Sequence, residues 1–262
     1  MRWAVIAWAL AAATGPALAE PLPPCAGVIE LADIRVVAAK PGGALVLADG
    51  RKLQLEGVIL PDARSDRAPD IYAKEAGDAL SDLARGRRIV AAAHSRLKDR
   101  YGRIEAQLFL PGNPDDPWLQ VAMLRRGLGR VFIAPERPEC ANELYAAERI
   151  ARARRLGIWT SRAYAVRAPD GIDAHDRGTF QIVQGKVVSA AVKNGRAYID
   201  FGADWRSDFT ATIAPDGMKL FRKAGIDPRT YAGQIIRVRG WIDEYHGPEI
   251  EIAAPEDVEV VE

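Results

Sequence analysis

The sequence predicts an α+β protein, mainly β with helices, in which two small barrels follow each other along the chain. Residues 28–60 and most of residues 179–262 alternate apolar and polar side chains between glycine-rich interruptions. Alternation of this kind is typical of short antiparallel strands with one buried face. Helical spacing of apolar residues follows the first group of strands, and one short helical segment interrupts the second group. Strands that close into a small barrel, with helices covering one end, suit an OB-type fold, so we expect two of them.

The chain of 262 residues suits two small domains, because a domain usually takes about 100–200 residues. We expect a signal peptide over residues 1–19, a first barrel domain over residues 28–161 and a second barrel domain over residues 179–262. Residues 162–178 are rich in proline, glycine, alanine and charged side chains without periodicity. This composition predicts the linker.

The clearest element of the first domain is a hairpin. Asp49-Gly50 lies between two alternating segments, residues 45–47 and 53–55, and this dipeptide favours a two-residue turn. The other elements expected in this domain are helices over residues 71–84, 118–126 and 142–156 and strands over residues 88–94 and 104–110. In the second domain we expect strands over residues 180–188, 196–202, 209–213, 233–242 and 248–253 and a helix over residues 217–224.

The first residues have the composition of a secretory signal. Arg2 is basic, residues 3–13 are apolar, and Ala17 and Ala19 form a small-residue cleavage site before Glu20. The apolar core is too short to cross a bilayer, and no other run of about 18 apolar residues follows it. We therefore expect export to the periplasm or the medium, with no transmembrane segment after cleavage. The alternative is an uncleaved anchor helix.

Charge is balanced over the mature chain but unevenly spread. Residues 20–165 carry 23 basic and 19 acidic side chains, and residues 166–262 carry 12 and 16. A strong nonspecific nucleic-acid binder usually needs a clear basic excess, because release of counterions from the phosphates drives that affinity. Nucleic-acid binding is therefore possible but not required.

Cys25 and Cys140 are the only cysteines. In an exported protein an isolated pair is most simply a disulfide, and two cysteines permit one connectivity. Such a bond would tie the mature N-terminus to the start of a later helix. The alternative is two free thiols.

Two motifs carry a family resemblance. The first is the gapless segment from Gly42 to Asp62, which holds the hairpin and ends in Leu60-Pro61-Asp62; the second is the turn Asp99-Arg100-Tyr101-Gly102-Arg103. Together they resemble the staphylococcal nuclease (thermonuclease, TNase-like) family over roughly residues 33–160. The resemblance implies an OB-type barrel and phosphodiester cleavage assisted by Ca²⁺. In that chemistry two aspartates hold the metal, a glutamate activates water, and two arginines stabilise the transition state.

Most of those catalytic residues are replaced in this chain. Gly43 and Ile59 occupy the positions of the two metal-binding aspartates, and Gln54 occupies that of the first arginine. Asp62 stands where the glutamate would be, and Arg103 matches the second arginine. Because Ca²⁺ needs anionic oxygen ligands, we expect no metal at positions 43 and 59 and no cofactor.

Two residues of the turn have alternative interpretations. Arg103 either contacts phosphate or orients its turn against a carboxylate. Tyr101 either packs against a nucleotide, as the resemblance implies, or is structural.

The second domain has a possible nucleic-acid-binding strand. Arg237, Arg239 and Trp241 share one face of a strand by their period-two spacing. Cations beside an aromatic ring are how OB folds hold single strands. The alternative is a surface stripe with one half-buried ring.

These observations favour an exported TNase-like protein with a degenerate catalytic site, which acts by binding single-stranded nucleic acid or an envelope protein. One alternative is an active secreted nuclease that cleaves DNA or RNA with Arg103, Asp62 and a relocated metal, for which Ca²⁺ would be the cofactor. A second alternative is a structural envelope protein whose barrels serve as interaction surfaces.

Overall fold

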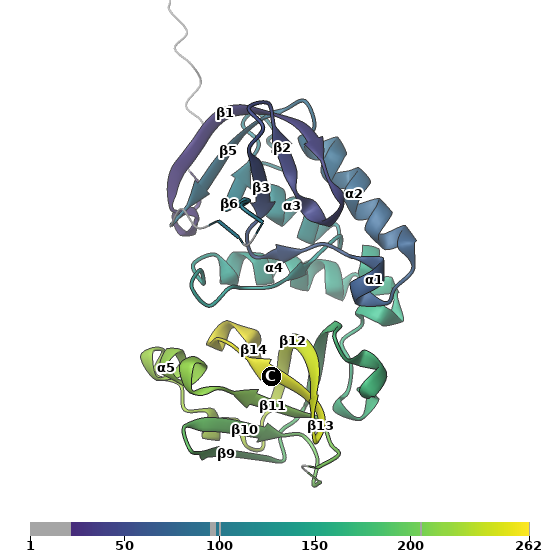
Figure 1. Cartoon of the computed structure of the whole chain (residues 1–262), viewed down its shortest axis with the longest axis vertical. Helices are drawn as coiled ribbons and strands as arrows, with labels where there is room; N and C mark the ends of the chain where they lie inside the picture. The colour runs from purple at the N-terminus through teal and green to yellow at the C-terminus, as the bar shows by residue number, and fades with distance from the viewer. Residues whose placement is uncertain (1–21, 95–97, 100, 205, 262) are drawn as a thin grey trace, which may run out of the picture.

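A computed structural model describes residues 22–94, 98–99, 101–204 and 206–261. The expected signal sequence and Arg100 lie outside these residues. The described chain forms two bodies stacked along its long axis, the N-terminal one above the C-terminal one in Figure 1. Within the described residues, no helix is long and apolar enough to cross a membrane.

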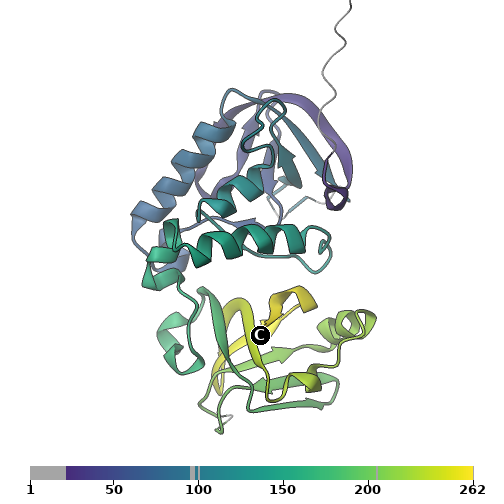
Figure 2. The same cartoon turned by 180° about the vertical axis from the view of Figure 1, so that it is seen from behind.

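The N-terminal body is a closed five-stranded barrel with helices packed on it. The strand order is β1-β2-β3-β6-β5, and β3 and β6 are parallel. The helix α2 joins the third barrel strand to the fourth, and α3 and α4 cover the side that faces the second body (Figure 2). The elements are β1 (Val28–Ala39), β2 (Leu45–Leu47), β3 (Lys52–Leu55), β4 (Val58–Ile59), α1 (Ala63–Asp66), α2 (Asp70–Ala84), β5 (Arg88–Ala93), β6 (Ile104–Phe109), α3 (Leu119–Arg125), β7 (Arg130–Val131) and α4 (Ala141–Ala153).

The predicted hairpin and disulfide are both present in this body. Leu45 pairs with Leu53 across β2 and β3. The loop is one residue longer than the predicted two-residue turn, because Leu47 donates to Arg51 across the three residues 48–50, and Gly50 has the positive φ of 84° that this loop requires. Cys25 and Cys140 are disulfide-bonded across 115 positions of sequence. The bond fixes the segment before β1 to the start of α4.

The C-terminal body repeats the topology of the first. Its order is β9-β10-β11-β13-β12, with β8 on the other side of β12 and with β11 parallel to β13. Val187 donates to Gln234 beside β12, whereas Val188 donates to Asp200 on β10. The chain therefore changes neighbours between β8 and β9, which act as two halves of one bent strand and complete an OB-like circuit. The elements are β8 (Phe180–Lys186), β9 (Ser189–Lys193), β10 (Arg196–Asp200), β11 (Thr210–Ile213), α5 (Pro215–Lys223), β12 (Ile235–Tyr245), β13 (Gly247–Ile252) and β14 (Val258–Val260).

Two short strands of the C-terminal body were not predicted from the sequence, nor was the two-residue β7 of the first body. β9 is almost wholly exposed, so its side chains show no apolar alternation. β14 has three residues and pairs with β12 at residues 236–238. Neither segment carries the burial pattern on which a sequence-based prediction depends.

The linker, residues 162–178, is packed against both bodies. Tyr164 is 2% exposed and Ile172 is 6% exposed. Arg167 extends the edge of β8: its N–H donates to Ile182, and its carbonyl accepts from Gln184. Each barrel has its own apolar core, and a third apolar cluster joins α4, the linker and β8. The two barrels are therefore held together by a buried contact.

Candidate functional site

The turn before β2 leaves little room for a metal-binding side chain. Gly42 and Gly43 both have positive φ, at 76° and 88°, a conformation that L-residues rarely adopt. A Cβ atom on Gly43 would lie 3.2 Å from Cδ1 of Leu60 and 3.3 Å from Nε2 of Gln54. That Nε2 atom donates to the carbonyl oxygen of Gly42. The space beside the turn is therefore filled by a leucine side chain and an amide.

The residues around this turn do not fit a Ca²⁺ ion, which takes six to eight oxygen ligands, carboxylates among them. Ile59 offers an alkyl group that packs on the apolar cluster between the barrels, and Leu60 is 8% exposed. Oε1 of Gln54 is buried without a hydrogen-bond partner, so the turn has one free side-chain oxygen, which is neutral. Among the residues that the structure describes, no group of three or more His, Cys, Asp or Glu side chains is placed to hold a metal ion.

Asp62 caps the N-terminal end of α1. Its Oδ1 accepts from the backbone N–H of Ser65 at 2.8 Å and from the Ser65 hydroxyl at 2.9 Å. These hydrogen bonds lower the pKa of Asp62 below its ordinary value. The carboxylate is therefore the N-cap of α1, a role that requires no catalysis.

Arg103 is held within its own turn. Its Nε lies 2.5 Å from Oδ2 of Asp99, and its guanidinium lies 5.0 Å from the ring centroid of Tyr101. Burial raises the pKa of Asp99, but hydrogen bonds from Arg103 and Tyr101 outweigh burial, and the pKa is lowered. This geometry matches the turn-orienting alternative. In the described part of the chain, no hydrogen bond or ion pair joins Arg103 to Asp62.

The structure corrects the expected open face on β12. Arg239 is only 2% exposed and points into the first body. Its guanidinium donates to both carboxylate oxygens of Glu148 on α4, at 3.0 and 3.1 Å, and to the carbonyl of Val131. It also donates to Glu259 at 2.8 Å and lies 4.4 Å from the ring centroid of Tyr145.

The neighbours of Arg239 on β12 contact residues of their own domain. Arg237 donates to Gln184 at 2.6 Å and lies 3.3 Å from Glu259. Trp241 is 45% exposed, and its ring makes an edge contact with Phe180. The period-two spacing therefore gave the correct face, but Arg239 on that face binds the first domain, and both arginines are paired within the chain.

Charges in this interface are mutually compensated. Burial lowers the pKa of Arg239, but Glu148 and Glu259 outweigh burial and raise it above its ordinary range. Burial raises the pKa of Glu259, but Arg239 and Arg152 outweigh burial, and the pKa is lowered. Both groups therefore stay charged in the interior, as a buried pair must if it is to offset its desolvation.

A second buried ion pair lies in the same interface. Arg130 of β7 donates to Asp66 of α1 and to the carbonyl oxygen of Phe180 of β8, each at 2.6 Å. Its guanidinium also lies 4.9 Å from the ring centroid of Tyr164 in the linker. The linker and both barrels therefore meet at one arginine.

Sequence reasoning missed Glu148 as a structural residue, although one signal was available. It lies four residues after Leu144 and three before Ala151, both of which are buried. Residues at this spacing share a helix face, so a glutamate there requires a buried cation.

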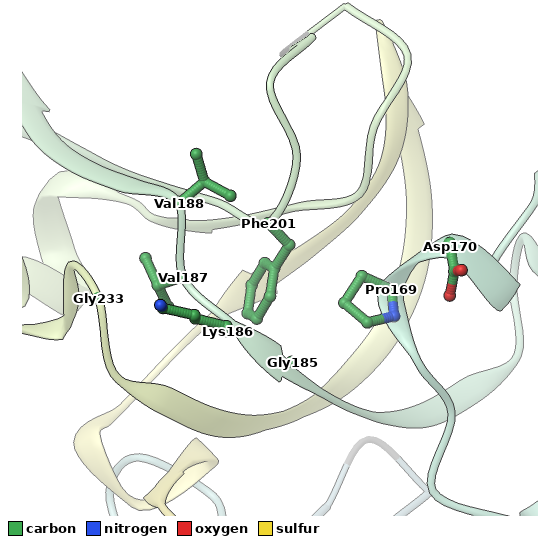
Figure 3. A pocket seen from close by; sticks show the side chains of 8 residues that line it. All are labelled: Pro169, Asp170, Gly185, Lys186, Val187, Val188, Phe201 and Gly233. Carbon is green, nitrogen blue, oxygen red and sulfur yellow. The ribbon is translucent and has the colours of Figure 1, made fainter.

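A hollow of about 730 Å³ lies where β8 bends into β9. Figure 3 shows the ring of Phe201 between Lys186 and Pro169, with the Asp170 carboxylate directed away from the ring. The lining residues are Pro169, Asp170, Gly185, Lys186, Val187, Val188, Phe201 and Gly233. Asp170 and Lys186 are the ionisable residues of this lining, and no hydrogen bond or ion pair joins these two described residues.

The geometry defines a class: two OB-like barrels joined by a buried interface, the first with a leucine side chain and an amide packed beside the Gly42–Gly43 turn. Residues 52–161 match the family model described as staphylococcal nuclease homologue. The chain therefore carries a domain of the staphylococcal nuclease family, which confirms the motif resemblance. The match begins at β3, so the Gly42–Gly43 turn lies before it. The turn contacts Gln54 and Leu60, which lie within the matched residues. A search of curated proteins found no match.

Proposed function

We propose that this protein is a catalytically silent member of the nuclease family that works by binding in the cell envelope. The observation that carries the proposal is the filled turn: Gly43 has a backbone conformation unsuited to aspartate, and the Leu60 side chain occupies the adjoining space. Asp62 and Arg103, the remaining candidates for chemistry, are each engaged within a few residues of themselves.

The expected loss of rate is large. Removing one preorganised stabiliser of a transition state costs about 10²–10³ in rate. Both metal carboxylates and one arginine are replaced here by Gly43, Ile59 and Gln54. Such losses do not add independently, but several orders of magnitude is the appropriate expectation. This supports a binding role over hydrolysis.

Export is part of the proposal. The signal-like composition of residues 1–19 and the Cys25–Cys140 disulfide support it, because structural disulfides persist mainly outside the cytosol. An envelope partner is favoured over nucleic acid, since Arg237 and Arg239 are both engaged in ion pairs within the chain.

The test is a cleavage assay with purified residues 20–262. Labelled single-stranded DNA and RNA are incubated with the protein in Ca²⁺, in Mg²⁺ and in a chelator, and products are separated by size. We expect no cleavage above buffer. Metal-dependent turnover that Arg103→Ala abolishes would establish the active-nuclease alternative instead.

A further inference from the structure

A group of cations gathers at the end of the first barrel that is far from the second body. These cations come from the middle of β1, the β2–β3 hairpin, the C-terminal end of α2 and the start of β5, and these segments lie together at the top of Figure 1. Backbone hydrogen bonds fix this proximity: Ala48 donates to Arg35, and Val36 donates to Arg87. We name this surface the apical patch; its cations are Arg35, Arg51, Lys52, Arg85, Arg87 and Arg88.

The apical patch has an excess of positive charge. Its six cations face three carboxylates: Asp33, which pairs with Arg88, Asp49, which pairs with Arg51, and Asp82 on the last turn of α2. Within the described residues, no carboxylate forms an ion pair with Arg35, Arg85 or Arg87, and all three are exposed. The patch therefore has three unpaired arginines.

One register position makes the excess costly. Arg35 of β1 lies directly opposite Arg88 of β5, and both side chains point outward because Ile34 and Ile89 form the neighbouring inward pair. Like charges directly across a strand pair destabilise a sheet; Asp33 offsets the charge of Arg88, whereas Arg35 has no carboxylate partner among the described residues. An anion outside the barrel would relieve this repulsion.

We propose that the apical patch binds a surface of anionic lipid headgroups. A planar surface suits the outer side of the strands, from which Arg35 and Arg88 project. Val37 is 45% exposed, two residues from Arg35 on the same strand, so it can enter the boundary between headgroups and acyl chains.

Single-stranded nucleic acid is the less suitable partner. Binding of single strands uses aromatic side chains on which bases stack. The exposed aromatic residues among those described are Tyr101, Phe132 and Trp241, none of which belongs to β1, β2, β3, α2 or β5. The patch offers charge without a stacking surface.

The charge distribution of the chain would orient it on such a surface. The half with the patch carries 23 basic and 19 acidic side chains over residues 20–165, whereas residues 166–262 carry 12 and 16. The acidic body lies at the opposite end of the molecule (Figure 1). An anionic surface therefore attracts one end and repels the other.

The test is sedimentation of residues 20–262 with vesicles of phosphatidylcholine alone or with 30% phosphatidylglycerol. We expect binding only to the anionic vesicles, weakening with salt. A triple variant, Arg35→Gln, Arg85→Gln and Arg87→Gln, should bind these vesicles about a hundredfold more weakly. Removing one to two cations near the surface lowers the affinity about tenfold.

The matched control removes three unpaired exposed arginines elsewhere on the first domain: Arg125→Gln, Arg154→Gln and Arg155→Gln. It has the same net charge and should keep at least a third of the wild-type affinity. Three results would each overturn the proposal. The first is an equal loss of affinity in both triple variants, and the second is no binding to the anionic vesicles. The third is tighter binding of a labelled thirty-base single strand through the same patch. The cleavage assay tests the proposed loss of catalysis separately, so the lipid-binding proposal and the proposed function can each fail alone.

Discussion

The interdomain ion pair between Arg239 and Glu148 makes the sharpest prediction about stability. Both side chains are almost fully buried, at 1% and 0% exposure. Glu148→Gln keeps the shape of the side chain but removes the charge that faces two guanidinium nitrogens. Arg239 then retains Glu259, the Val131 carbonyl and the Tyr145 ring.

Removing one partner of a buried pair usually costs about 3–5 kcal/mol, because the other charge stays buried. Glu259 remains close to Arg239, so we expect a cost near the lower end, about 3 kcal/mol in the free energy of unfolding. The double variant Glu148→Gln/Arg239→Met should be more stable than Glu148→Gln alone, because it leaves no unpaired cation.

Urea unfolding followed by tryptophan fluorescence measures these free energies. Glu143→Gln is the matched control: it lies on the same helix, is exposed, and should change the free energy by less than about 0.5 kcal/mol. A loss below about 1 kcal/mol in the free energy of unfolding of Glu148→Gln, or no coupling in the double-mutant cycle, would refute a stabilising role for this buried ion pair.

Three further predictions concern separate features. Burial raises the pKa of Asp257 to about 6, so the stability that this group contributes is full below its unfolded pKa near 4 and is lost as pH rises through 6. The free energy of unfolding of Asp257→Asn should therefore rise by about 3 kcal/mol relative to wild type between pH 4 and pH 7.5. A difference in urea unfolding that does not change with pH would contradict the pKa shift. Gly43→Asp should destabilise by about 1–3 kcal/mol, because a non-glycine residue is strained at positive φ, and calorimetry should detect no Ca²⁺ binding; a stable variant that binds Ca²⁺ would show that the turn is adaptable. Reduction of the Cys25–Cys140 bond should lower the free energy of unfolding by about 4–5 kcal/mol in the chain-entropy model for a loop of this length, and an unchanged urea midpoint in reductant would exclude that contribution.

Local features of this fold were predictable from sequence, because their causes are local. The Asp49-Gly50 turn needs a positive φ at one residue, and the sequence supplies a glycine, Gly50, at that position. The two cysteines admit only one pairing. The replacement of metal ligands by Gly43 and Ile59 was likewise readable from aligned motifs.

The interdomain contact was not predictable, because one sequence does not distinguish a strand face that meets solvent from one that meets another domain. Arg237, Arg239 and Trp241 do share a face, as their spacing indicates, but Glu148, the buried partner of Arg239, lies 91 residues earlier in the chain. The sequence also did not reveal that Leu60 fills the space beside Gly43, since that contact depends on how β4 returns to the turn. Both features depend on tertiary packing.

The filled turn is tested most directly by a calcium titration of the isotopically labelled protein, observed by nuclear magnetic resonance. We expect the amide signals of Gly43, Ile59 and Leu60 to stay unchanged up to millimolar Ca²⁺. Saturable shifts centred on these three residues would show that a calcium site exists there and would contradict the account.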